Sequence, residues 1–185
     1  MDLREKQLSS DLVYQGGFLQ VRKDKVALPD GGEAQREYIL HPGAVAILAL
    51  TADGALVLER QYRYPAGREF VEIPAGKIDP GEAPEATARR ELFEETGYRS
   101  DNWTYLGTAH PCIGYSNEKI SYYLAQDLIL NERKLDDGEF LEVLTVPLER
   151  AMDMALTGEI CDSKSIVGLH WLAAHLGGRM RGVPI

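Results

Sequence analysis

The sequence predicts an α/β fold, an α/β/α sandwich in which a mixed β-sheet lies between helices. Three observations predict it. The apolar run at residues 44–50, AVAILAL, is typical of a strand buried on both faces. A stretch of helix formers at residues 84–96 follows a group of predicted strands. After a second group of strands, the chain closes with two stretches of helical character.

The first 41 residues are predicted to form a separate small β segment. Residues 11–40 alternate as strands do and divide into three short strands, with breaks at Gly16-Gly17 and at residues 29–32. Three short strands bury little surface by themselves. We therefore expect residues 1–41 to pack against, or exchange with, a second copy of the chain, and residues 42–185 to form the main domain.

The main domain is predicted to contain further strands and two C-terminal helices. The expected strands cover residues 55–63, 69–75, 103–108, 119–126 and 140–146. A helix from Pro147 to Gly158 has apolar residues at helical spacing, and these are expected to face the core: Leu148, Ala151, Met152, Ala155 and Leu156. A last helix is predicted at residues 163–176, and the tail after it, GGRMRGVPI, is expected to be mobile.

Composition bounds the class of protein. A chain of 185 residues fits one domain, or one domain with a small appendage. A net charge of −9 without a Lys/Arg run argues against nucleic acid and against an anionic membrane as partners. Cys112 and Cys161 lack metal-type spacing, which indicates a reducing cytoplasm and no disulfide framework. No stretch has the pattern of a signal peptide or a membrane span.

The predicted helix at residues 84–96 places its acids unusually. At about 100° per residue, Glu91 and Glu95 lie one turn apart on the apolar face. Glu94 crowds them, and like charges at this spacing oppose helix formation by a few tenths of a kcal/mol. Arg90 can pair with Glu94, which leaves Glu91 and Glu95. A hard divalent cation such as Mg²⁺ would suit these carboxylates; the alternative is a solvated acidic face.

The stretch around this helix, GKIDPGEAPEATARRELFEETGY, resembles the Nudix box, the signature of the Nudix hydrolases. The positions that match are Gly76, Glu82, Arg90, Glu91, Leu92, Glu94, Glu95 and Gly97. Tyr98 departs from the pattern, since the family more often has an aliphatic residue there. The resemblance implies the Nudix-type α/β/α sandwich over roughly residues 42–176. It also implies a loop–helix–loop that holds divalent metal for pyrophosphate cleavage.

Residues outside the box look like the ADP-ribose pyrophosphatase branch of that family. These are residues 60–82, 138–143 and 157–166, together with the N-terminal strands. The resemblance implies an enzyme that uses Mg²⁺, which Mn²⁺ can replace, and that cleaves ADP-ribose to AMP and ribose 5-phosphate. In that branch the N-terminal strands form a swapped homodimer and reach over the partner's active site.

The resemblance also implies residue roles. The carbonyl of Ala75 and the carboxylates of Glu91 and Glu95 would hold metal. Glu94 would share a metal or bind its water. Arg90 would orient the carboxylates through charge-assisted pairs.

Substrate contacts follow in the same way. Arg63 would contact a phosphate, and Glu72 would hydrogen-bond the nucleotide or the ribose. From the residues alone, Glu72 is equally a paired edge charge. Phe18, Arg36 and Glu37 of the other subunit would contact the adenine end, where Phe18 is either a stacking platform or a core residue.

The general base would come from a loop after the main sheet. Glu139 is our first candidate, and Asp137, Glu142 and Glu118 are its rivals. A base must come within hydrogen-bond reach of the attacking water, which the sequence does not specify.

Two alternative functions stay open at this point. Within the family, the substrate is another nucleoside diphosphate sugar such as GDP-mannose. Outside enzymes, the chain is a non-catalytic sensor that binds ADP-ribose and regulates a partner.

Overall fold

The computed structural model describes residues 1–185 with the exception of residues 133, 134, 136, 137 and 139. The chain forms two compact units. The first consists of Met1–Pro42 and His110–Lys119, and the second of Gly43–Ala109 and Ile120–Ile185. In the described part of the chain, no helix combines the length and the apolar character that a membrane span requires.

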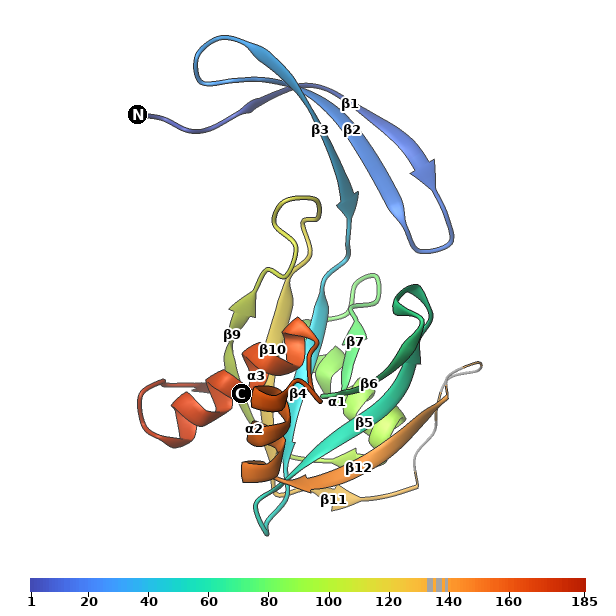
Figure 1. Ribbon diagram of the computed structural model, residues 1–185, viewed down its shortest axis with the longest axis vertical. Helices are drawn as coiled ribbons and strands as arrows, with labels where there is room; N and C mark the ends of the chain where they lie inside the picture. Colours follow the sequence, from blue (N-terminus) through green and yellow to red (C-terminus); the bar gives the residue numbers. More distant parts are fainter. Residues whose placement is uncertain (133–134, 136–137, 139) are drawn as a thin grey trace. The chain divides into compact units, whose positions relative to one another are not determined.

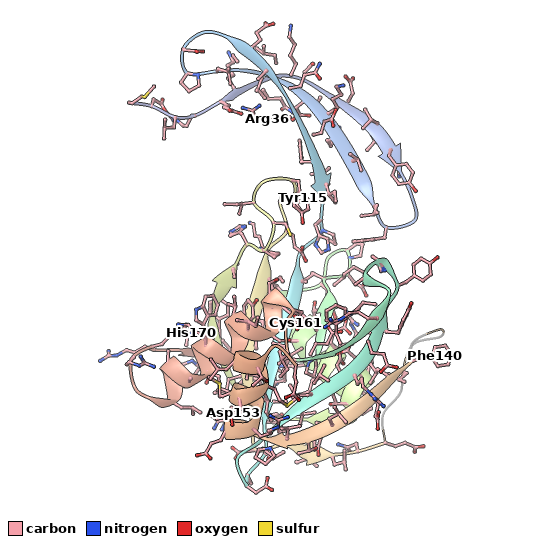
Figure 2. All side chains as sticks on the ribbon, in the orientation of Figure 1. Arg36, Tyr115, Phe140, Asp153, Cys161 and His170 are labelled. Carbon is pink, nitrogen blue, oxygen red and sulfur yellow. The ribbon has the colours of Figure 1, made fainter. Side chains whose placement is uncertain are left out.

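The first unit is built on a three-stranded antiparallel sheet in the order β1-β2-β3 (Figure 1). Its strands are β1 (Lys6–Gln15), β2 (Gln20–Ala27) and β3 (Glu33–Leu40). The prediction of three N-terminal strands is confirmed, although β1 begins before its expected start. The loop His110–Lys119 joins this unit, because the Ile39 N–H donates to the carbonyl of Tyr115 at 2.8 Å. Figure 2 labels Arg36 and Tyr115, which both belong to the first unit.

The second unit is built on an eight-stranded mixed sheet in the order β12-β5-β4-β10-β9-β13, with β6 beside β5 and β7 beside β4. Its strands are β4 (Ala44–Leu50), β5 (Ala55–Arg63), β6 (Arg68–Glu72), β7 (Ala75–Lys77), β9 (Asn102–Ala109), β10 (Ile120–Gln126), β12 (Leu141–Pro147) and β13 (Val183–Pro184). Strand β10 runs parallel to β4, and the other pairs are antiparallel. A separate two-stranded ladder joins β8 (Tyr98–Arg99) to β11 (Ile129–Leu130).

Helices cover both faces of this sheet. They are α1 (Pro84–Thr96), α2 (Leu148–Thr157) and α3 (Ser163–Leu176). Successive residues of β4 point to opposite faces. Ile47 belongs to a cluster with Leu92 of α1, whereas Leu48 belongs to a cluster with Leu169 of α3. The predicted arrangement of a mixed sheet between helices is therefore confirmed.

Two details of the C-terminal third differ from the expectation. Leu156 was expected in the core but is 84% exposed, and Met154 is buried in its place beside Ala151. The tail is not free: Val183 pairs with Tyr105 of β9, and the Ile185 N–H donates to a carbonyl of the same strand at 3.2 Å. A short strand therefore satisfies backbone groups that the sequence pattern alone leaves unassigned.

The predicted strand at residues 69–75 is in fact two strands. Pro74 has no N–H to donate, and the chain leaves β5 at Glu72. The carbonyl of Pro74 instead accepts the Ile47 N–H at 2.8 Å, and β7 then continues antiparallel to β4. This crossing from β5 to β4 brings Ala75 and the residues after it next to the centre of the sheet.

Candidate active site

The residues at the two ends of helix α1 determine where the helix begins and ends, and therefore where its acidic side chains lie. Pro84 occupies its first turn, and Gly97 ends it in the left-handed conformation, φ 79°, with its N–H on the carbonyl of Phe93 at 2.8 Å. Ala83 offers no side-chain cap, but the Thr87 hydroxyl donates to the carboxylate of Glu82 at 2.8 Å. The loop before α1 is thereby tied to the first turn of the helix.

Arg90 is the centre of an ion-pair network. Its guanidinium donates to both carboxylate oxygens of Glu82 at 3.1 and 2.9 Å. It also donates to Glu91 and to Glu94, each at 2.9 Å. Hydrogen bonds from Arg90 hold the pKa of Glu82 below its usual value, and the same contacts raise the pKa of Arg90. One planar cation therefore fixes three carboxylates, including Glu91, which the helix periodicity alone leaves unpaired.

The remaining box acids lie against the β7 backbone. Glu95 is buried, and its carboxylate accepts the Ala75 N–H at 3.1 Å. The carboxylate of Glu91 lies so close to Gly76 that a Cβ at that position would collide with it. The glycine is thus required by the approach of a side chain to the backbone. The three expected metal ligands, Ala75, Glu91 and Glu95, come together here.

The residues present fit a hard divalent cation. Carboxylate and carbonyl oxygens are the ligands that Mg²⁺ prefers, and Mg²⁺ usually keeps several waters and shares substrate phosphates. Among the described residues, no group of three or more His, Cys, Asp or Glu side chains could hold a metal by itself. Two carboxylates and a backbone carbonyl would fill only part of the coordination sphere of Mg²⁺, which leaves positions for water and for phosphate oxygens.

A second ion-pair network lies in the same unit around Glu72. This carboxylate is 2% exposed. Arg63 donates to both of its oxygens, at 2.7 and 2.8 Å, and Lys164 contacts one of them. Burial lowers the pKa of Arg63, but hydrogen bonding and charge from Glu72, with added charge from Glu59 and Glu95, raise it overall. Glu72 is a paired buried charge in this structure, so substrate contact by this residue remains a prediction.

Residues at the beginning of α3 contact Glu72 and Ile73, the segment that precedes β7 and the loop before α1. Asp162 caps the helix through the Ser165 N–H at 3.0 Å and also contacts Lys164 at 3.1 Å. The Ser165 hydroxyl in turn accepts the Ile73 N–H at 2.9 Å. Lys164 and Ser165 therefore hold Glu72 and Ile73, immediately before the Pro74-Ala75 step.

Glu59 is a buried carboxylate that the sequence analysis did not single out. It pairs in register with Glu72 and is 0% exposed. Neither of its oxygens has a hydrogen-bond partner in the described part of the chain. Burial, followed by repulsion from Glu72, raises the pKa of Glu59 to about 8 against the opposing charges of Lys164 and Arg63. Glu59, Glu72 and Glu95 thus form an acidic interior that the two cations only partly compensate.

The other predicted substrate residues belong to the first unit. Phe18 is 45% exposed and meets the ring of His41 edge-on, with 5.3 Å between centroids. Arg36 is paired with Glu5 at 3.0 Å, and Glu37 with Lys23 at 3.4 Å. All of these contacts lie within one unit, so contact of Phe18, Arg36 and Glu37 with a nucleotide remains a prediction.

The identity of the general base remains a prediction as well. Glu139 and Asp137 lie outside the described residues. Of their rivals, Glu142 of β12 forms an ion pair with Arg60. Glu118 lies in the loop of the first unit, 3.8 Å from the ring of His41.

Models of known protein families match most of the chain. The NUDIX domain model matches residues 40–166, and the model of the nucleoside diphosphate sugar hydrolase N-terminal domain matches residues 5–39. The chain is 40% identical over 172 residues to the ADP-ribose pyrophosphatase of Bacillus subtilis (strain 168), which covers 92% of this chain and 93% of that one. It is 36% identical over 170 residues to the methanol dehydrogenase activator of Bacillus methanolicus, covering 91% and 92%.

A solved structure described as an ADP compounds hydrolase has the same fold, with a TM-score of 0.85 at 24% identity over 97% of this chain and 98% of that one. These matches define the class of protein. The chain belongs to the Nudix family of hydrolases. The family resemblance of the box is therefore confirmed.

Lys164 and Glu59 are the residues that sequence reasoning missed. Lys164 lies in the segment 157–166, which resembles the family branch, but nothing in that segment reveals that it reaches Glu72, 92 residues away. For Glu59 the sequence does contain a weak indication of burial. It is an acid two positions after Val57, a core residue, on a strand whose alternation points both to the same face.

We expect loss of the Lys164 charge to destabilise the protein. Lys164→Met leaves the buried Glu72 with one cation, and breaking a buried pair costs about 3–5 kcal/mol. Urea unfolding should show that the free energy of unfolding falls by about that amount in Lys164→Met. Lys164→Arg should retain much of the wild-type stability. The control is Arg150→Met, which breaks an exposed pair with Glu159 and should cost less than about 1 kcal/mol. Equal effects of the two Met variants would contradict the role given to Lys164.

Glu59 should make the metal-free protein less stable as the pH rises. Its folded-state pKa, about 8, exceeds the ordinary value of 4.5. The protonated form therefore stabilises the fold fully below about pH 4.5, and this contribution is lost as the pH rises through about 8. In EDTA, Glu59→Gln should raise the melting temperature more at pH 8.5 than at pH 5.5. The control is Glu69→Gln on the exposed part of β6, which should change the melting temperature equally at the two pH values. An effect of Glu59→Gln that does not depend on pH would refute the raised pKa of Glu59.

Proposed function

We propose that this protein is a Mg²⁺-dependent pyrophosphohydrolase that cleaves ADP-ribose to AMP and ribose 5-phosphate. The observation that carries the proposal is the convergence of Glu91 and Glu95 with the backbone of Ala75, next to the network centred on Arg90. The name of the Bacillus subtilis relative, ADP-ribose pyrophosphatase, supports the choice of substrate. The two free thiols, Cys112 and Cys161, support a reducing cytoplasm as the compartment.

The metal would be held by Glu91, Glu95 and the carbonyl of Ala75, with Mn²⁺ able to replace Mg²⁺. When bound, it would neutralise charge on the pyrophosphate and lower the pKa of a bound water. Glu94, which Arg90 holds at 2.9 Å, would share the metal or bind its water. Phosphoryl transfer requires mostly positioning and electrostatic stabilisation from a protein, so the main contribution of this network would be to orient the carboxylates.

Arg63 would position a phosphate of the substrate. It lies at the end of β5, its guanidinium is oriented by Glu72, and its side chain is 42% exposed, so N–H donors stay available. A chain with a net charge of −9 repels an anionic substrate at long range, which makes such a local cation necessary. Glu139 would orient or deprotonate the attacking water.

The experiment is product analysis with Mg²⁺ and a panel of ADP-ribose, GDP-mannose, ADP-glucose, NADH and diadenosine polyphosphates. We expect metal-dependent release of AMP and ribose 5-phosphate from ADP-ribose, faster than turnover of the others. Glu95→Gln should lower turnover by several orders of magnitude with an unchanged fold. Faster cleavage of GDP-mannose would identify GDP-mannose, rather than ADP-ribose, as the substrate. An active Glu95→Gln variant would refute the metal assignment.

A second candidate function is a ligand-dependent regulator. The Bacillus methanolicus relative is named as an activator of another enzyme. Tight binding of ADP-ribose without turnover of any member of the panel, at saturating Mg²⁺, would favour this reading over hydrolysis.

We also propose a homodimer with shared active sites, in which Phe18, Arg36 and Glu37 serve the partner's site. The whole of β1 is exposed, and the first unit exposes several large apolar side chains: Leu3, Leu8, Leu12, Val13, Tyr14, Phe18 and Leu19. An open sheet edge with apolar side chains favours pairing with another chain.

Complementation tests the shared site. Arg36→Ala and Glu95→Gln homodimers should both be impaired in ADP-ribose hydrolysis. A co-expressed hybrid should recover activity, because one of its two sites combines an intact Arg36 with an intact Glu95. The absence of recovery, or a monomer in sedimentation at micromolar concentration, would contradict the proposal.

A further inference from the structure

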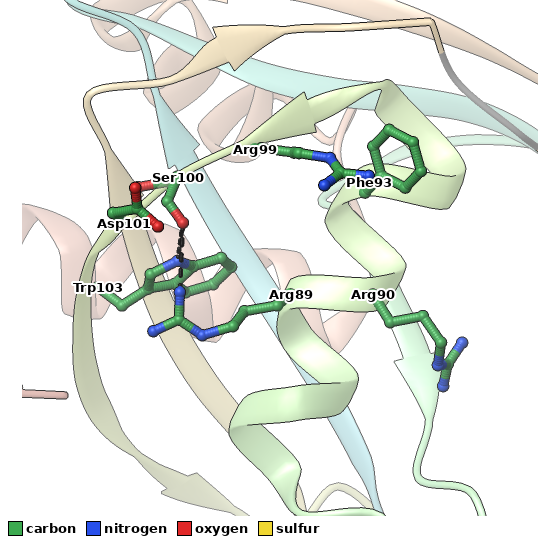
Figure 3. A pocket seen from close by; sticks show the side chains of 7 residues that line it. All are labelled: Arg89, Arg90, Phe93, Arg99, Ser100, Asp101 and Trp103. Carbon is green, nitrogen blue, oxygen red and sulfur yellow. Dashed lines mark hydrogen bonds between the residues drawn. The ribbon is translucent and has the colours of Figure 1, made fainter.

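A pocket of about 330 Å³ lies between α1 and the segment around β8 (Figure 3). Seven residues line it: Arg89, Arg90, Phe93, Arg99, Ser100, Asp101 and Trp103. Three of them are arginines and one is an acid, in a chain whose net charge is −9. Arg90 belongs to the network of box carboxylates, but that network does not explain the presence of Arg89 and Arg99.

Arg89 is held in place on one side of the pocket. Its guanidinium carbon lies 5.1 Å from the centroid of the Trp103 ring, a cation–π contact. The carbonyl of Ser100 accepts both the Arg89 Nη1–H at 3.2 Å and the Trp103 Nε1–H at 2.8 Å, as drawn in Figure 3. A guanidinium has five N–H donors, so most of those on Arg89 are available to a ligand.

Arg99 is held in a similar way. Its guanidinium carbon lies 3.9 Å from the centroid of the Phe93 ring. Phe93 follows Arg89 by four residues on α1, so the two stacked pairs are neighbours along one face of the helix. Aromatic rings orient both guanidiniums without consuming their N–H donors.

The two arginines differ from Arg90 in their charge partners. Arg90 is engaged by Glu82, Glu91 and Glu94, and Figure 3 shows its side chain directed away from Arg89 and Arg99. Within the described residues, by contrast, neither Arg89 nor Arg99 forms an ion pair. Asp101 is the acid among the lining residues, so two unneutralised guanidiniums outweigh one carboxylate.

We propose that this pocket is a second anion site, which binds a phosphate group through Arg89 and Arg99. Guanidinium groups match the geometry of phosphate oxygens and form strong charge-assisted hydrogen bonds with them. The volume admits a phosphate with a small organic substituent, and Asp101 weakens binding by repulsion. The site is separate from the carboxylates held by Arg90 and does not depend on the proposed substrate.

The test is a titration of the metal-free full-length protein with inorganic phosphate at constant ionic strength. Trp103 lies under Arg89, so its fluorescence reports occupancy, and a Trp171→Phe background removes the other indole. We expect saturable binding that Arg89→Gln and Arg99→Gln each weaken about tenfold or more, and that Asp101→Asn tightens. The opposite pattern, in which the arginine variants bind phosphate more tightly and Asp101→Asn binds it more weakly, would contradict an anion site.

Arg181→Gln is the matched control, because it changes the net charge equally at an exposed position outside the pocket. Arg89→Lys keeps the charge but loses the planar fork, so it should bind phosphate with intermediate affinity. The glutamine variants should keep the wild-type melting temperature within a few degrees and keep the hydrolysis rate within about twofold. Equal phosphate affinity in wild type and in the Arg89→Gln/Arg99→Gln double variant would overturn the proposal.

Further titrations identify the natural source of the phosphate. Equal affinities for inorganic phosphate, ribose 5-phosphate and AMP would assign recognition to the phosphate group alone. Tighter binding of AMP, lost in the same arginine variants, would assign the site to a nucleoside monophosphate.

Discussion

The geometry of the site depends on one guanidinium. Helix α1 carries Glu91 and Glu94 beside Arg90, and the loop before the helix supplies Glu82. Without a cation among them, these carboxylates would repel one another and oppose the helix. Arg90 contacts all three through its planar fork, so neutralisation and orientation come from the same side chain. The carboxylate of Glu91 also lies so close to Gly76 of β7 that a side chain at that position would collide with it.

A similar balance operates in the interior where side chains of β5, β6, α1 and the beginning of α3 meet. Three carboxylates, Glu59, Glu72 and Glu95, are buried there, and the cations near them are Arg63 and Lys164. Buried charge is costly unless it is paired, and three ionised carboxylates would exceed the two cations. Burial, followed by repulsion from Glu72, raises the pKa of Glu59 to about 8, so this carboxyl group keeps its proton at neutral pH. An interior of this kind favours the arrival of a cation, in agreement with a divalent metal at the adjacent box carboxylates.

Local patterns predicted most of the fold and named the box residues that meet at the candidate site, whose roles remain predictions. The positions of α1 and of the buried strand β4 follow from helix formers, Gly97 and an unbroken apolar run. Contacts between distant segments could not be predicted in this way. Lys164 reaches Glu72 across 92 residues. The pairing of Val183 with β9 likewise depends on the finished sheet, because a two-residue strand has no periodicity of its own.

We propose that Glu91, Glu95 and the carbonyl of Ala75 bind a divalent cation. The most direct measurement is anomalous diffraction from crystals of the wild-type protein soaked with Mn²⁺. We expect an anomalous peak about 2 Å from oxygens of all three residues, with water in the remaining positions. A Mn²⁺ peak elsewhere, with none at these oxygens, would contradict it.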